Sequence, residues 1–191
     1  MPSLTLTGDP EADSLLSDNA FALLIGMLLD QQISMELAFI GPARLAARLD
    51  GTLDPATVAA MDPADLEARF REKPALHRYP GSMATRVHAL AQHLVDHHDG
   101  DASAVWRDAG TGAELKTRIA ALPGFGDQKA RIFLALLGKQ CGVTPPGWQE
   151  AAGDYGRDGD RSIADVTDPD ELAKVRAWKQ ATKAAKKAGK G

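Results

Sequence analysis

Leu122-Pro123-Gly124-Phe125-Gly126-Asp127-Gln128-Lys129-Ala130 is the stretch of this sequence that decides the fold. Residues 114–121 before it have the pattern of a short helix. After it, apolar residues recur at the i, i+3, i+4 and i+7 spacing of a helix packed into a core, at Ala130, Phe133, Leu134 and Leu137. The stretch is therefore a tight hairpin turn between two helices.

Two glycines in this turn, Gly124 and Gly126, let the backbone adopt positive φ and approach another surface closely, while Pro123 fixes the entry to the turn. Amide N–H groups at a turn that opens a helix form a concave positive nest, which suits a phosphate and reads no base. An ordinary helix-helix turn with a glycine cap has the same spacing. The pattern alone leaves both interpretations open.

The composition predicts an all-α protein with an aliphatic core. Hydrophobic residues make up 44% of the 191 residues but aromatic residues only 5%, and Ala-rich and Leu-rich segments outnumber alternating ones. Residues 4–7 are the sole strand-like tract. The most apolar run, residues 21–29, is too short to cross a bilayer, and no secretory signal is visible. We expect a cytoplasmic protein, nucleoid-associated in a bacterium, with no membrane partner.

The cysteine and histidine content argues against two kinds of cofactor. The single cysteine, Cys141, permits no internal disulfide, predicts no disulfide-linked partner and excludes a four-cysteine iron-sulfur or zinc site within the chain. His93 and His97 have the i, i+4 spacing of zinc ligands. Neither a third ligand nor a His-Glu-x-x-His pattern accompanies them, so they predict no metal site.

Charge divides the chain unevenly. The net charge is −4, yet seven of the 22 basic residues lie between Lys174 and Lys190, where there is no acid. We therefore expect one all-α domain over residues 1–173, with the hairpin unit at 112–138, and a basic C-terminal helix end or tail over 174–191. Such an end could follow a polyanion or be a solvated, frayed terminus.

Helix-start signals organise the rest. An acid followed by proline predicts helices near 55–60 and 63–71 and a final helix that begins at Asp168. Residues 20–29 form a helix that is apolar on most faces and therefore central and buried. Gly41-Pro42 then predicts an interruption, with another helix over 43–49.

The buried helix ends abruptly in the polar segment Asp30-Gln31-Gln32-Ile33-Ser34. Two adjacent glutamines at the end of a core helix are either solvent-facing residues or amides placed to hydrogen-bond the edge of a base.

Three separated signals together resemble a known family. Leu-Leu-Asp-Gln-Gln at residues 28–32, Pro80-Gly81-Ser82 leading a helix, and the hairpin at residues 122–130 are similar to the helix-hairpin-helix (HhH-GPD) superfamily of base-excision DNA repair glycosylases, which includes endonuclease III, adenine glycosylase and alkylbase glycosylase. The similarity covers roughly residues 18–150, and the chain most resembles small bacterial members known only as repair-like.

The resemblance implies a glycosylase-like helical bundle that binds damaged double-stranded DNA and flips a nucleotide. Gln32 would fill the space left by the extruded nucleotide, and Trp148 would lie near the rim of the pocket. A monovalent cation would sit on the carbonyl oxygens of Ala120, Leu122 and Phe125, with no other cofactor. The DNA-binding residues would be Gln31, Gln32, Ser82, Arg86, Gly124, Phe125, Gly126, Gln128, Lys129 and Trp148.

Two departures from the family concern the chemistry. Lyase-competent members carry a lysine nucleophile where this chain has Gln128. Lys129 follows, but one helical residue rotates a side chain by about 100°, so we expect no lyase step. The family aspartate, which stabilises the charge that develops on the sugar, would fall at residues 144–146, where there is no carboxylate. The candidate replacements are Asp30, Glu150 and Asp154.

Three functions fit these residues. The first is a DNA-repair protein that extrudes a base, with monofunctional N-glycosylase chemistry. The second is a non-catalytic DNA-binding or lesion-sensing protein that has lost the aspartate. The third is a helical protein-interaction domain with a purely structural hairpin, which the acidic body favours.

Overall fold

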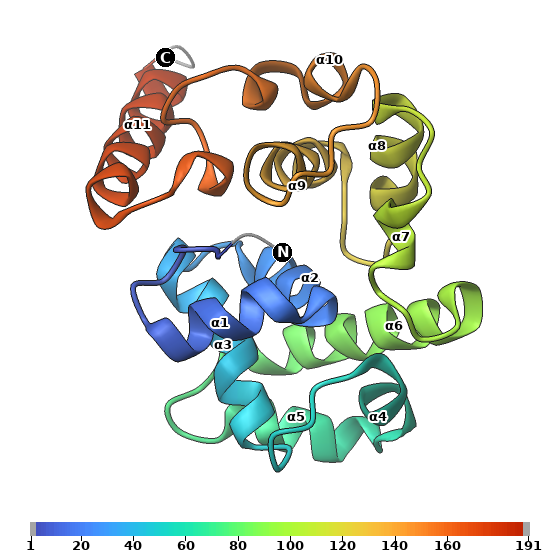
Figure 1. Ribbon diagram of the computed structural model, residues 1–191. Coiled ribbons are helices and arrows are strands. Elements are labelled where there is room, and N and C mark those ends of the chain that lie inside the picture. The colour runs from blue at the N-terminus through green and yellow to red at the C-terminus, as the bar shows by residue number, and fades with distance from the viewer. Residues whose placement is uncertain (1–2, 189–191) are drawn as a thin grey trace.

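The computed structural model describes residues 3–188, which form helices joined by loops, with no strand among them. The expected all-α class is confirmed. Two groups of helices lie one above the other in Figure 1. The lower group comprises α1 Pro10–Asp18, α2 Ala20–Leu29, α3 Met35–Ala47, α4 Pro55–Ala60, α5 Pro63–Arg71 and α6 Pro80–His98.

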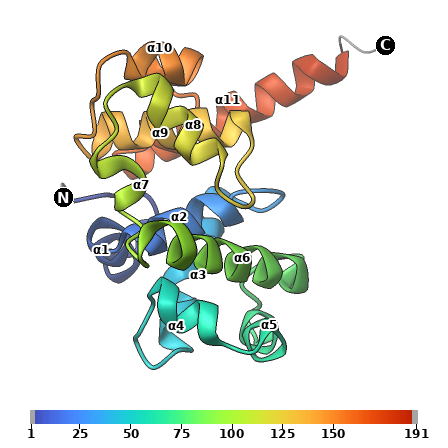
Figure 2. The ribbon, with the colours of Figure 1, turned by 90° about the vertical axis from the view of Figure 1, so that its right-hand side faces the viewer.

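The upper group contains the hairpin unit and the C-terminal helix. It comprises α7 Ala104–Arg107, α8 Gly112–Ala120, α9 Asp127–Gln140, α10 Trp148–Ala152, the short 3-10 helices η1 Gly153–Gly156 and η2 Ile163–Asp165, and α11 Pro169–Ala188. Figure 2 shows that α11 extends away from the other helices toward its C-terminal end.

Helix α2 is the centre of the core, as its composition predicts. Every side chain from Phe21 to Leu29 is buried, and the Asn19 side chain caps the helix by accepting the amide of Ala22. Helix α3 packs closely against it, since Gly26 has no Cβ where the Phe39 ring lies; a Cβ there would be 2.6 Å from that ring. This packing fixes where α2 ends and the polar segment begins.

The acid-proline signals mark real helix starts. Asp9, Asp54 and Asp62 each accept backbone amides from the first turn of the helix that follows, and each helix begins with proline. A side-chain cap of this kind stabilises a helix by about 1 kcal/mol.

Two sequence predictions were wrong in detail. Gly41-Pro42 does not interrupt the chain, because Pro42 lies inside the continuous helix α3 and the bare Gly41 fits against the Leu29 side chain of α2. Burial of this helix face offsets the one hydrogen bond that proline removes. Leu4 and Leu6 form no strand; their buried amides donate to Ser17 Oγ and Asp13 Oδ1 of α1 instead.

Within residues 3–188, no single helix has the length and hydrophobicity needed to cross a membrane. Helices α1 and α2 reach those limits only as a pair, and they meet at 115°.

Candidate functional site

The hairpin between α8 and α9 rests on the central helix. Gly124 has φ +85°, and a Cβ there would lie 3.2 Å from Leu28 Cδ1 of α2. The Phe125 amide donates to the Leu122 carbonyl at 3.0 Å and closes the turn. The requirement for positive φ is confirmed for Gly124 but was wrong for Gly126, whose φ of −97° and ψ of 177° are open to any residue.

The first turn of α9 carries no side-chain cap. Gly126 occupies the N-cap position, where it offers no side-chain oxygen, and a Cβ there would meet nothing within 4 Å. The Asp127 side chain instead pairs with Lys116 of α8 at 3.0 Å and with Arg131 of α9 at 2.8 Å. The hydrogen bond from Lys116 lowers the pKa of Asp127. The α9 amides thus form the open positive end of a helix dipole.

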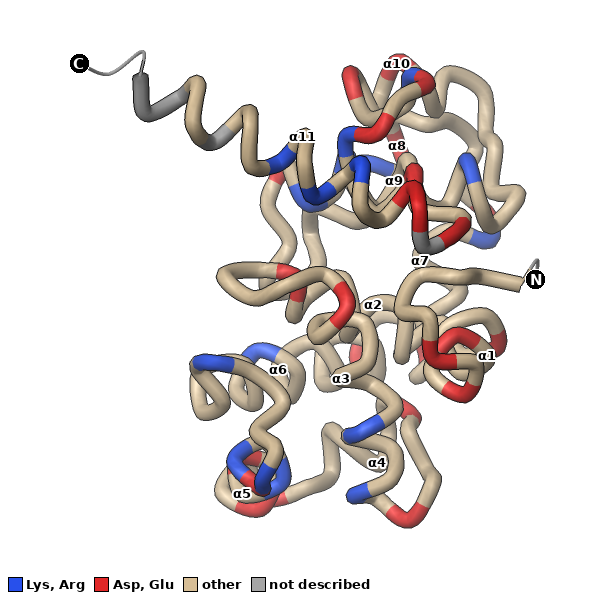
Figure 3. The backbone as a smooth tube through the Cα atoms, turned by 90° about the vertical axis from the view of Figure 1, so that its left-hand side faces the viewer, with Lys and Arg blue, Asp and Glu red and all other residues tan. Residues whose placement is uncertain are grey.

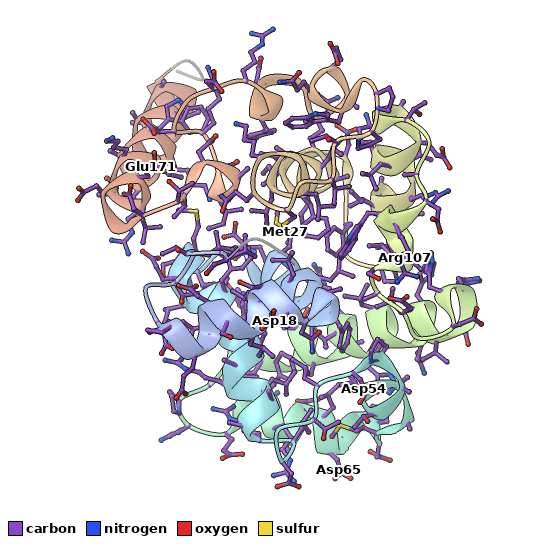
Figure 4. All side chains as sticks on the ribbon, viewed as in Figure 1. Asp18, Met27, Asp54, Asp65, Arg107 and Glu171 are labelled. Atoms are coloured by element: carbon purple, nitrogen blue, oxygen red, sulfur yellow. The ribbon has the colours of Figure 1, made fainter. Side chains whose placement is uncertain are left out.

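A cleft of about 1150 Å³ opens beside this helix end, between the two groups of helices. Figure 4 labels the side chain of Met27, which lines the cleft, between α2 and α9. The segment after α2, the start of α9 and the middle of α11 supply most of the walls. The lining residues are Met27, Asp30, Gln31, Gln32, Ile33, Gly126, Gln128, Lys129, Ile132, Tyr155, Arg161, Trp178, Lys179 and Thr182.

Asp30 is the only acid among the described residues that line this cleft. Its side chain is 10% exposed, and its Oδ2 atom lies 3.7 Å from Lys179 Nζ on α11. A carboxylate so far withdrawn from water needs a neighbouring cation, which Lys179 supplies.

Lys129 also lies in the cleft. Its Nζ donates to the carbonyl oxygens of Met27 and Leu28, each at 2.8 Å, and so satisfies the C-terminal end of α2. Burial lowers the pKa of Lys129 to about 8; Asp30 raises that pKa in part, and Arg86 lowers it further. The rotation expected between positions 128 and 129 therefore does not carry Lys129 out of the cleft.

The two glutamines are held differently. The Gln31 amide is fixed by Leu28 O at 2.9 Å and by Arg86, whose Nη1 donates to Gln31 Oε1 at 3.2 Å. Gln32 is exposed and has φ +59°, a left-handed conformation that is uncommon for a residue other than glycine. Strain of this kind collects at functional sites.

Buried His77 holds this segment in place. Its Nδ1 accepts the Tyr79 amide at 3.0 Å, so Nε2 carries the proton and donates to the Gln31 carbonyl at 2.9 Å. The segment that carries both glutamines is thereby tied to the loop before α6.

Four predicted side chains lie elsewhere. Glu150, Asp154, Trp148 and Ser82 do not line the cleft. Glu150 is on α10, and Asp154 is on η1, where it pairs with Arg157 at 3.3 Å. Ser82 is exposed on the first turn of α6.

Trp148 is displaced for a packing reason. Its ring covers Gly138 of α9 and its backbone covers Gly112 of α8, where no Cβ could be accommodated. It therefore joins α10 to the hairpin unit instead of reaching the cleft rim. The Phe125 ring is buried against Phe133 at a centroid distance of 6.0 Å, so any contact of this residue with DNA is through its backbone, as the resemblance implies.

Helix α11 contributes what sequence reasoning missed. Trp178, Lys179 and Thr182 line the cleft, as do Tyr155 and Arg161 from the connector before the helix. Figure 3 shows basic residues along α11. The one available signal was a tryptophan within a run of basic residues at the end of the chain.

Comparison with known families now bears on this geometry. A model described as "HhH-GPD superfamily base excision DNA repair protein" matches residues 25–190. The chain belongs to this superfamily. The match includes the hairpin, the segment at residues 30–33 and α11, so the three elements that line the cleft lie inside it. Membership of this superfamily supports a role in base-excision DNA repair. Comparison with curated proteins finds no match.

Proposed function

We propose that this HhH-GPD protein binds damaged double-stranded DNA through the hairpin, extrudes one nucleotide into the cleft and hydrolyses its N-glycosidic bond without a lyase step. The observation that carries the proposal is the juxtaposition of the uncapped start of α9 with a cleft that contains a largely buried carboxylate, Asp30.

Binding rests on the backbone of the hairpin. The amides that open α9 provide hydrogen-bond donors and the positive end of a helix dipole for one DNA phosphate. Gln32 would occupy the space in the duplex that an extruded nucleotide leaves, and its exposure and left-handed backbone beside the cleft support this role. Arg86 and Lys179 add positive charge around the same opening.

Asp30 supports hydrolysis. Cleavage of the N-glycosidic bond develops positive charge on the sugar, and a fixed carboxylate in a cleft shielded from water stabilises that charge or activates water. Asp30 is the acid in position to act, since Glu150 and Asp154 lie outside the cleft. Its ion pair with Lys179 keeps the carboxylate oriented.

Two residues support the absence of a lyase step from this proposal. Gln128 stands at the family's lysine position and donates to Tyr155 Oη at 2.9 Å. The neighbouring amine of Lys129 is engaged with the two carbonyls at the end of α2. It thus acts as a helix cap in this proposal, not as a nucleophile.

A monovalent cation at the hairpin is part of the proposal. The carbonyl oxygens of Ala120, Leu122 and Phe125 would hold it. The Leu122 oxygen already accepts the Phe125 amide but keeps a second lone pair, and no turn hydrogen bond among the described residues uses the other two oxygens. Such an ion would supply fixed positive charge beside a bound phosphate.

The test is release of free base from duplexes that each carry one oxidised, deaminated or alkylated base. Asp30→Asn is expected to lower the rate of release by about 10²- to 10³-fold while the protein still binds the duplex. Glu150→Gln and Asp154→Asn are matched controls that keep the wild-type rate. If Asp30→Asn retained full turnover, Asp30 would not be the catalytic acid.

A second function is favoured by the residues at 144–146, which include no acid. In this case the protein recognises a lesion and extrudes the nucleotide but cleaves nothing. Salt-dependent binding with no product from any damaged duplex would support this function over hydrolysis.

A further inference from the structure

Trp178 is an aromatic residue whose position the packing of the protein does not explain. It lies on α11, it is 38% exposed, and it is one of the four exposed large hydrophobic residues in the described part of the chain. Unlike Leu37, Tyr79 and Val95, which share that exposure, it lines the cleft. Exposure of an indole to water is unfavourable unless a partner covers it.

Two ion pairs fix α11 near Trp178. Arg176 pairs with Glu36 in the first turn of α3, and Lys179 pairs with Asp30 at the end of α2, so ion pairs hold α11 on both sides of the indole in sequence. Val175 is fully buried and anchors the same turn of the helix. Trp178 is thus held at the cleft wall.

The rest of the cleft lining suits a flat apolar ring with polar edges. Met27, Ile33 and Ile132 supply apolar surface, while Gln128 and Tyr155 supply polar groups that already bond to each other. A base that leaves the DNA stack loses its stacking partners, and an aromatic side chain restores part of that energy.

We propose that Trp178 stacks on the base that is extruded into the cleft, because its exposed indole lines the cleft that Asp30 and the hairpin border. This inference rests on the proposed function. It assigns to α11 the recognition of the base, in addition to any attraction that its lysines exert on phosphate.

The test compares two duplexes that differ only in the presence of a base. One carries 2-aminopurine opposite a mismatched base, and the other carries a tetrahydrofuran abasic site at the same position. Trp178→Ala is expected to weaken binding to the first by about 5- to 100-fold and to leave binding to the second unchanged within twofold. Trp178→Phe is expected to restore most of the loss.

The emission of 2-aminopurine provides a second readout. Bound to the unsubstituted protein, the probe is stacked and quenched; bound to Trp178→Ala, it is expected to be brighter. Gln180→Ala is the matched control, since Gln180 is exposed on α11 and does not line the cleft. Thermal melts verify that both variants fold.

The outcomes separate the two proposals. Absence of duplex binding by the unsubstituted protein at low salt overturns the proposed function and this inference together. Equal weakening on both duplexes, or none on either, with unchanged 2-aminopurine emission, overturns the stacking role alone.

Discussion

Gly126→Ala is the substitution that best isolates the DNA contact of the hairpin from the stability of the fold. Its φ of −97° is accessible to alanine, and the new Cβ has no neighbour within 4 Å. Loss of backbone freedom in the unfolded chain stabilises the variant by about 0.4–1 kcal/mol. Alanine is a poorer N-cap than glycine by a similar amount. The two effects offset each other, so the Tm should stay within about 3 °C.

Gly124→Ala is the contrasting variant in the same turn. A left-handed conformation costs an alanine about 1–2 kcal/mol, and its Cβ would press on Leu28 Cδ1 at 3.2 Å. The expected fall in Tm is about 2–8 °C. Alanine at two glycines separated by one residue is thus expected to destabilise the fold at Gly124 and to leave it nearly unchanged at Gly126.

For DNA affinity, in contrast to stability, Gly126→Ala is expected to have a large effect. A phosphate that bonds to the α9 amides must approach the Cα of Gly126, and a methyl group there obstructs it. Loss of one or two hydrogen bonds to a charged group, each worth about 1.5–3 kcal/mol, weakens binding by at least about tenfold. Fluorescence anisotropy with a labelled damaged duplex at low and moderate salt measures this. Wild-type affinity for Gly126→Ala would refute a phosphate at this turn.

Three further predictions follow from Lys129 and the segments around the cleft. The pKa of Lys129 is lowered to about 8 from its ordinary value of 10.5, so the protonated side chain destabilises the fold below pH 8 and this cost disappears as the pH rises to 10.5. Across that pH window, the free energy of unfolding should therefore increase by on the order of 1–3 kcal/mol relative to that of Lys129→Met. Denaturant titration at several pH values measures this difference. Borohydride added to the protein with an abasic duplex should trap no covalent adduct; an adduct that Lys129→Met abolishes would contradict the capping role. His77→Ala leaves the Gln31 carbonyl without its hydrogen-bond donor and should lower the free energy of unfolding by about 1–3 kcal/mol. It should also weaken binding to a damaged duplex more than binding to an intact one. Tyr79→Phe, the control, should change neither quantity.

The sequence predicted the parts of the site that depend on local backbone chemistry. The hairpin, its supporting central helix and the polar segment at residues 30–34 follow from spacing, caps and apolar periodicity. These signals depend on residues that are close together in sequence, so they can be interpreted without knowledge of the fold.

Side-chain positions that depend on distant packing could not be predicted. Trp148 was expected at the cleft rim, but Gly112 and Gly138, far from it in sequence, create the surface that it covers. The rotation of about 100° from Gln128 gave no reason to place Lys129 in the same pocket, but the end of α2 offers its amine two carbonyl acceptors. Trp178 was not predicted as a site residue, because its approach to the cleft depends on ion pairs of neighbouring residues with Glu36 and Asp30.

The reach of Lys129 from the hairpin to the end of α2 has a mechanical consequence. A DNA strand that pulls on the hairpin at Gly126 would also pull, through Lys129 three residues later, on the carbonyl groups of Met27 and Leu28 at the end of α2. Asp30 follows these residues closely in the chain. In the proposed function, binding by the hairpin and chemistry at Asp30 are therefore linked through this amine as well as through the contact of Gly124 with Leu28, so that a duplex held in the wrong register would misplace the acid.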